Sequence, residues 1–127
     1  KGGGLIRYDV KTGKVIEQKI LPIDGYLNQV YKHGEHHLIL YNNSHLALYE
    51  NGEVVLNAKL SGPISYAEWS DIEQGWHVAG WRELLFLSTT KQNRIQLDEI
   101  AVFIDATTGL YLCNDGKWDI IDIQEEE

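Results

Sequence analysis

Short apolar segments alternate with polar turns along the whole chain. Turn signals rich in Gly, Asn and Asp recur about every 8–12 residues, a spacing typical of proteins built from many short strands. No segment keeps the 3.6-residue periodicity of an amphipathic helix. The pattern predicts about thirteen short strands, at 5–10, 14–20, 26–32, 36–41, 45–50, 53–60, 64–70, 76–81, 83–88 and 94–98, with three more in 100–123.

A unit of strand, turn, strand, turn and strand occurs twice, in residues 36–60 and 100–123. Aligned 64 residues apart, Leu46 falls on Leu110 and Leu48 falls on Leu112. Each unit contains an Asn-Gly or Asp-Gly pair, which favours a tight type I′ hairpin because both positions tolerate positive φ. The repeat therefore predicts two antiparallel meanders of the same kind.

The fold class that follows is all-β, built from antiparallel meanders in a single domain of residues 1–127. The run 84–87 is apolar on both faces, which predicts a central strand covered on both sides. In 53–60, alternate residues from Val54 to Leu60 share one apolar face, with Val55 as the exception. These patterns leave a partial propeller, a curved meander sheet, a barrel and a sandwich open.

The N-terminal segment LIRYDVKTGKVIEQKIL, residues 5–21, resembles the outer hairpin of a β-propeller blade. The resemblance implies a propeller-like arrangement, although three or four blades are too few for an ordinary closed propeller. Such a partial propeller has open strand edges, so we expect it to associate with itself or with a neighbour.

Charge narrows the choice of partner. The formal net charge is −8, yet residues 1–32 hold six bases and three acids, whereas residues 33–127 hold five bases and sixteen acids. An acidic body repels nucleic acid and anionic membrane surfaces and attracts basic proteins. No apolar run approaches the ~18 residues of a membrane span, and the single Cys cannot form an internal disulfide. We therefore expect a cytoplasmic protein.

The best candidate for a binding surface is the segment 67–83, in which tryptophans lie among acids. Aromatic side chains anchor protein interfaces, and surrounding carboxylates pair with Arg and Lys of a partner. Because residues 76 and 81 alternate in direction along a regular strand, at least one of the two tryptophans is expected in the core. The candidate residues are Glu68, Trp69, Asp71, Glu73, Trp76, Trp81 and Glu83.

The sequence contains one histidine-rich cluster, His33, His36 and His37. Zinc needs three or four ligands that converge on one point, but His36 and His37 point to opposite faces if they begin a strand. The cluster is therefore interpreted as a polar turn rather than a metal site. We expect no cofactor and no catalytic residues.

A compact, acidic, all-β chain with this profile is similar to the immunity proteins of bacterial toxin–immunity systems of the contact-dependent growth inhibition type. The resemblance implies a non-catalytic inhibitor that covers the active cleft of a basic nuclease toxin with an acidic surface. It assigns no residue roles, so the candidate residues rest on local charge and aromatic content. A ligand-binding or metal-dependent enzymatic β domain, such as a fragment of a β-propeller protein, is the alternative.

Overall fold

The computed structural model describes residues 4–20, 23 and 25–122, and within these ranges it contains strands and no helix. The all-β prediction is confirmed. The strands are β1 (Gly4–Tyr8), β2 (Val15–Ile20), β3 (Leu27–His33), β4 (His36–Tyr41), β5 (His45–Glu50), β6 (Glu53–Lys59), β7 (Ile64–Ser70), β8 (Gly75–Gly80), β9 (Glu83–Leu87), β10 (Gln92–Gln96), β11 (Ala101–Ile104), β12 (Leu110–Cys113) and β13 (Trp118–Ile120).

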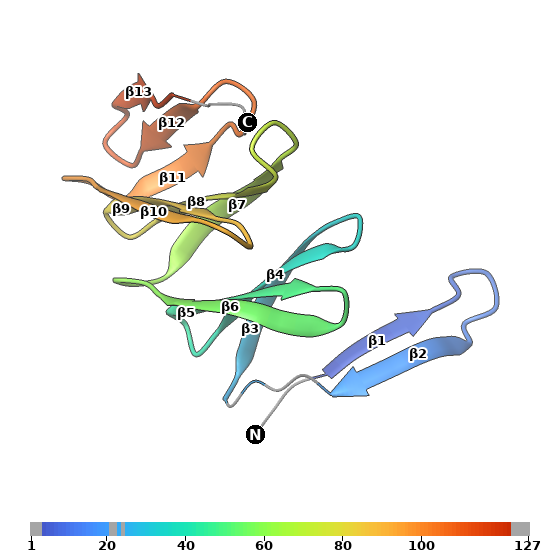
Figure 1. Ribbon diagram of the computed structural model, residues 1–127. Helices are drawn as coiled ribbons and strands as arrows, with labels where there is room; N and C mark the ends of the chain where they lie inside the picture. The colour runs from blue at the N-terminus through green and yellow to red at the C-terminus, as the bar shows by residue number, and fades with distance from the viewer. Residues whose placement is uncertain (1–3, 21–22, 24, 123–127) are drawn as a thin grey trace.

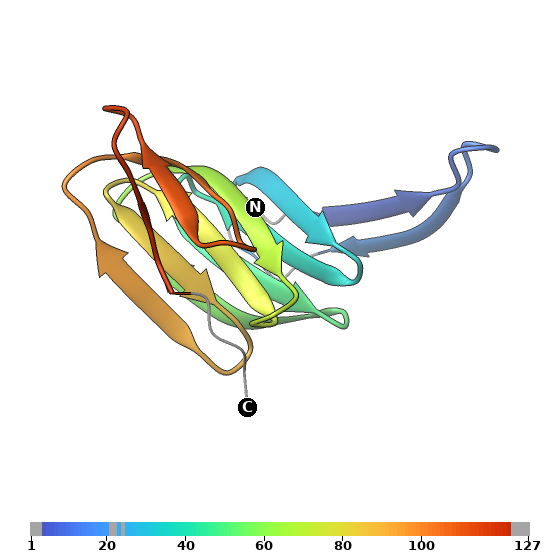
Figure 2. The same cartoon turned by 90° about the horizontal axis from the view of Figure 1, so that it is seen from above.

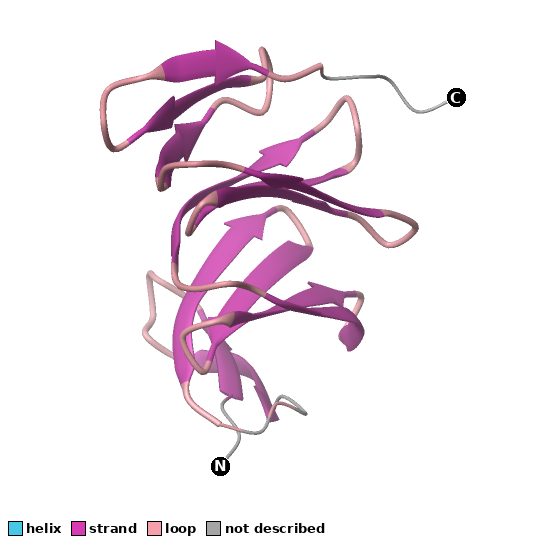
Figure 3. Cartoon of the chain, turned by 90° about the vertical axis from the view of Figure 1, so that its left-hand side faces the viewer, coloured by secondary structure: helices cyan, strands magenta, loops and turns pink. Residues whose placement is uncertain are grey.

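Three antiparallel meander sheets follow one another in chain order and stack face to face (Figure 1 and Figure 3). The first contains β3 to β6, the second β7 to β10 and the third β11 to β13. The hairpin β1–β2 projects away from this stack (Figure 2). The sheets do not close into a barrel, so that alternative is wrong; the strands form separate antiparallel sheets that stack.

The main core lies between the first and second sheets, because each presents alternate apolar side chains to the other. Leu38, Leu46 and Leu48 of the first sheet pack with Trp76 and Leu85 of the second. A smaller core, which includes Ala79, Leu84, Ala101 and Ile104, joins the second sheet to the third. The second sheet is therefore covered on both faces.

Strand β9 confirms the prediction of a central strand, since all five of its residues are buried and it pairs with β8 and β10. The strand predicted at 94–98 is displaced, because β10 spans Gln92–Gln96. Gln92 pairs with Leu87, so the connecting turn is shorter than the polar sequence 89–93 indicated.

A β-bulge explains the irregular pattern of β6. The register shifts between Leu48 and Tyr49, so that Leu48 pairs with Leu56 whereas Tyr49 pairs with Val54. The extra residue, Val55, is exposed, and Val54 is turned to the opposite face of the sheet from Leu56. The prediction that Val54 shares the face of Leu56 is therefore wrong.

Both repeat units form three-stranded antiparallel meanders, but they occupy different places in their sheets. The first unit supplies β4, β5 and β6, the second to fourth strands of a four-stranded sheet, and the second supplies the whole third sheet. Asn51 and Gly52 have φ angles of 50° and 83°, as the predicted type I′ turn requires.

Candidate binding groove

The first strands of the three sheets, β3, β7 and β11, border a groove of about 460 Å³. This volume falls within the ~300–1,000 Å³ common for ligand sites. The groove is lined by Tyr31, Lys32, His33, Ala67, Glu68, Trp69, Trp76, Phe103, Asp105 and Thr107. Because the sheets stack in chain order, residues far apart in the sequence meet here.

Two carboxylates, Glu68 and Asp105, face the groove from β7 and from the turn after β11. One oxygen of Glu68 accepts from the N–H of Ala106 at 2.7 Å, and the other accepts from the Tyr66 hydroxyl at 2.9 Å. Burial, together with this hydrogen bond, raises the pKa of Tyr66, so the hydroxyl stays protonated as a donor. A carboxylate has about four acceptor positions, so Glu68 keeps capacity for a ligand.

Asp105 is held in its charged form by the turn that follows it. The backbone N–H groups of Thr107 and Thr108 donate to its Oδ1 at 2.8 and 3.4 Å. The hydrogen bond from Thr107, supported by that from Thr108, holds the pKa of Asp105 below its usual value. Glu68 accepts from the residue next to Asp105, so the two carboxylates belong to one local hydrogen-bonded arrangement.

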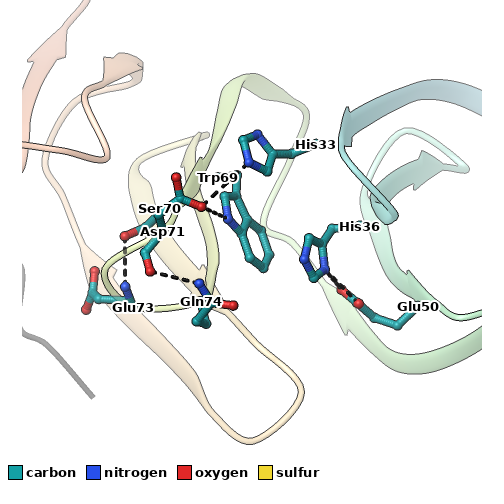
Figure 4. Close-up of polar contacts among 8 residues, drawn as sticks. All are labelled: His33, His36, Glu50, Trp69, Ser70, Asp71, Glu73 and Gln74. Carbon is teal, nitrogen blue, oxygen red and sulfur yellow. Dashed lines mark hydrogen bonds and ion pairs between the residues drawn. The ribbon is translucent and has the colours of Figure 1, made fainter. Parts of the chain in front are cut away.

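At one end of the groove, the indole of Trp69 stacks against two imidazoles of the β3–β4 hairpin (Figure 4). Its ring centroid lies 3.9 Å from that of His36 and 5.7 Å from that of His33. The indole N–H donates to Asp71 at 2.9 Å, and His36 contacts Glu50 at 2.7 Å. This cluster joins the first sheet to the second and fixes the orientation of Trp69.

Of the seven predicted binding residues, Glu68, Trp69 and Asp71 therefore gather at or beside the groove. Trp81 does not join them. It follows the far end of β8, five residue steps along the chain from Trp76, a distance of roughly 16 Å. The indole of Trp81 is partly exposed and lies over Gly62.

Three of the predicted surface residues are buried, which removes them from an exposed binding face. Trp76 is 2% exposed in the main core, although part of it reaches the groove wall. Glu73 is paired with His77, and Glu83 is paired with Arg94. The sequence alone does not distinguish these buried acids from the exposed Asp71, because the side chains that pair with them lie elsewhere in the chain or across a turn.

The histidine cluster does not converge on one point. His33 and His36 both lie beside Trp69, whereas His37 contacts Tyr49 on the opposite face of the first sheet. A tight turn with Gly34 at φ 61° places His33 opposite His36. Within the described ranges, no group of three or more His, Cys, Asp or Glu residues could hold a metal ion.

We predict that His37 makes the fold sensitive to acid. Burial, aided by the charge of Lys32, holds the pKa of His37 below its ordinary value, and its Nδ1 has no partner among the described residues. The native state then binds fewer protons than the unfolded state, so stability present above pH ~6.5 is lost as the pH falls below it. Urea unfolding of wild type and His37→Gln between neutral and mildly acidic pH measures this, and the variant should show the shallower decline. Equal slopes would contradict the assignment.

The groove residues that sequence analysis missed are those of β3 and of the β11 turn, above all Lys32 and Asp105. The sequence 105–109, DATTG, signals a turn through its Asp and Gly. Nothing in it indicates that the turn lies against Glu68, because that contact spans 38 residues.

The part of the chain that the structure describes has no helical segment with the length and apolar character to cross a membrane. Comparison with models of known protein families and with curated proteins finds no match for this chain.

Proposed function

We propose that the protein is a non-catalytic binding protein whose groove receives arginine side chains of a basic protein partner. The observation that carries the proposal is the pair Glu68 and Asp105, two carboxylates from different sheets that face the same groove. An arginine guanidinium matches such a site, because its planar fork donates several hydrogen bonds to carboxylates at once.

The charge of the rest of the molecule supports this proposal. The body is strongly acidic over residues 33–127, and a field of one sign steers a basic partner and raises its association rate by up to ~10³-fold at low salt. Asp71, whose side chain is exposed beside Trp69, adds a third acid near the groove. Lys32 and His33 line the groove from β3 and give it a polarity that would orient the partner.

More specifically, we propose that the protein is an immunity protein of a contact-dependent growth inhibition system and acts in the cytoplasm. The basic partner would be a nuclease toxin, and arginines of its active cleft would enter the groove. Occupation of the cleft would prevent access of the nucleic acid substrate.

A prediction follows for Glu68→Gln. The amide keeps an oxygen that accepts from Ala106 but removes the negative charge, so the fold is retained and arginine binding is weakened. We expect the variant to bind a fluorescent oligoarginine peptide about tenfold more weakly, equivalent to about 1.4 kcal/mol. Fluorescence anisotropy at low and at physiological salt measures the affinity.

Asp98→Asn is the matched control, because it removes one exposed acid that does not line the groove. It should change the affinity by less than about twofold, since the distance and salt screen its contribution. An equal loss in the two variants would mean general attraction to an acidic protein and would contradict a site in the groove.

The natural partner is tested with the same variants. Wild type and Glu68→Gln/Asp105→Asn are immobilised and exposed to lysate of the source organism, and the captured protein is assayed for nuclease activity. A basic nuclease held by wild type, released from the double variant and inhibited at one-to-one stoichiometry would support the immunity role. A partner retained equally by both would contradict the groove as its site.

The volume of the groove favours a second candidate, a domain that binds a small cationic ligand. If the ligand is a small cation, free arginine raises the melting temperature of wild type as much as the peptide does, and Glu68→Gln reduces both effects. Stabilisation by the peptide alone would favour the protein partner.

A further inference from the structure

The outer face of the third sheet is apolar and has no covering element among the described residues. Leu112 pairs with Trp118 across β12 and β13, and Leu110 pairs with Ile120. Trp118 and Ile120 are 63% and 58% exposed, and Leu112 is 36% exposed. We call these four residues the terminal face, because β12 and β13, which carry them, lie at the end of the stack (Figure 1).

The repeat indicates what this face is built to contact. Leu46 and Leu48 of β5, which align with Leu110 and Leu112, are fully buried in the core against the second sheet. Their cross-strand partners, Ala58 and Leu56, pack into the same core. The corresponding side of the third sheet therefore has the pattern of a surface onto which a further antiparallel sheet packs.

The hairpin β1–β2 also has apolar side chains that are not covered. It projects from the molecule beside the first sheet, at the end away from β12 and β13 (Figure 1), and Ile6, Val15 and Ile16 are each at least 60% exposed. A two-stranded hairpin is marginally stable in water unless a third strand or an apolar surface packs against it. Its apolar side chains are therefore expected to pack against another surface, because the three stacked sheets leave them exposed.

The hairpin and the third sheet carry opposite net charges. The hairpin, residues 4–20, carries four bases and two acids, whereas residues 98–122, which contain the third sheet, carry six acids and one base. Asp122 is exposed shortly after β13, and Lys11 and Lys14 are exposed at the turn of the hairpin. Opposite charges around an apolar contact favour docking in a fixed direction.

We propose that the terminal face of one molecule binds the β1–β2 hairpin of a second copy. The interface is head to tail, because the hairpin and the terminal face lie at opposite ends of one chain (Figure 1). Trp118 and Leu112 contact the apolar side chains of the hairpin, while Asp122 pairs with a lysine of the hairpin turn. An interface of this type forms a ring when its rotation closes and an open filament otherwise.

Sedimentation velocity over a range of protein concentrations tests the proposal with two variants. The face variant is Leu112→Asp/Trp118→Asp, and the hairpin variant is Lys11→Glu/Lys14→Glu. All four positions are exposed, so the variants are expected to fold, which circular dichroism verifies. Val55→Asp, an exposed apolar position in β6, is the control for the face variant, and Lys59→Glu is the control for the hairpin variant.

We expect wild type and both controls to assemble with rising concentration and each variant alone to remain monomeric. A mixture of the two variants should recover a dimer, because one retains its hairpin and the other retains its terminal face. High salt should weaken that dimer, since part of the attraction is between exposed charges.

Monomeric wild type at every concentration would overturn the proposal, as would assembly of the face variant. Failure of the mixture to recover a dimer would overturn the hairpin as the occupant of the face. These results are independent of the groove, because none of the substituted residues lines it.

Discussion

Arg94→Met should lower the free energy of unfolding by about 3 kcal/mol, because it leaves the carboxylate of Glu83 buried without its cation. The side chain of Glu83 is 1% exposed and accepts from Arg94 Nη1 at 2.9 Å and from the Ser61 N–H at 3.0 Å. Arg94 also donates to the carbonyl of Lys59 at 2.7 Å. The pair thus joins β9 and β10 to the end of β6, and its loss loosens the contact between two sheets. Urea unfolding followed by circular dichroism measures the change.

Arg82→Met provides the matched control. Arg82 is exposed in the turn between β8 and β9, next to Glu83, and the substitution makes the same chemical change. It should cost less than about 0.5 kcal/mol, as surface substitutions usually do. A loss at Arg82 as large as that at Arg94 would show that the buried pair is not the cause.

The double variant Glu83→Gln/Arg94→Met separates the charge from the packing. Glutamine still accepts from Ser61 but carries no charge, so the double variant should be more stable than Arg94→Met alone. If the double variant is no more stable, the cost of Arg94→Met comes from lost packing and from the Lys59 contact.

Local pattern predicted the strands well, because each strand and turn here is set by neighbouring residues. The Asn51-Gly52 pair fixes its own hairpin, and the apolar run 84–87 follows from burial on both faces. The position of β10 was missed because its sequence, QNRIQ, is polar and its strand identity comes from pairing with β9. The face on which Val54 lies was predicted wrongly, because a β-bulge reverses the direction of the side chains while the alternation of apolar and polar residues in the sequence stays the same.

The candidate site was harder to predict from the sequence, because exposed and buried acids have similar neighbouring residues along the chain. Glu68, Glu73 and Glu83 all lie in or beside strands among tryptophans, yet of these three only Glu68 lines the groove between β3, β7 and β11. Glu83 is buried because Arg94 reaches it from the neighbouring strand. Such partners are set by the stacking of sheets and their register, which no short segment encodes.

The second large effect is expected at Trp76, which sequence analysis placed among the surface candidates. Trp76→Ala should lower the free energy of unfolding by about 3–5 kcal/mol, because it opens a cavity in the core between the first two sheets. Trp118→Ala, at a position that is 63% exposed, is the control and should cost less than about 1 kcal/mol at dilute concentration. Comparable losses at the two positions would contradict a core role for Trp76.

Trp76→Phe tests the same site more finely. The indole N–H of Trp76 is buried and has no acceptor among the described residues, which costs about 1–3 kcal/mol in the native state. Phenylalanine removes that donor while keeping most of the apolar volume, so the relief should offset much of the lost packing. We therefore expect Trp76→Phe to cost less than half as much as Trp76→Ala in urea unfolding. A cost close to that of alanine would mean that the donor is satisfied by water from the groove that Trp76 borders.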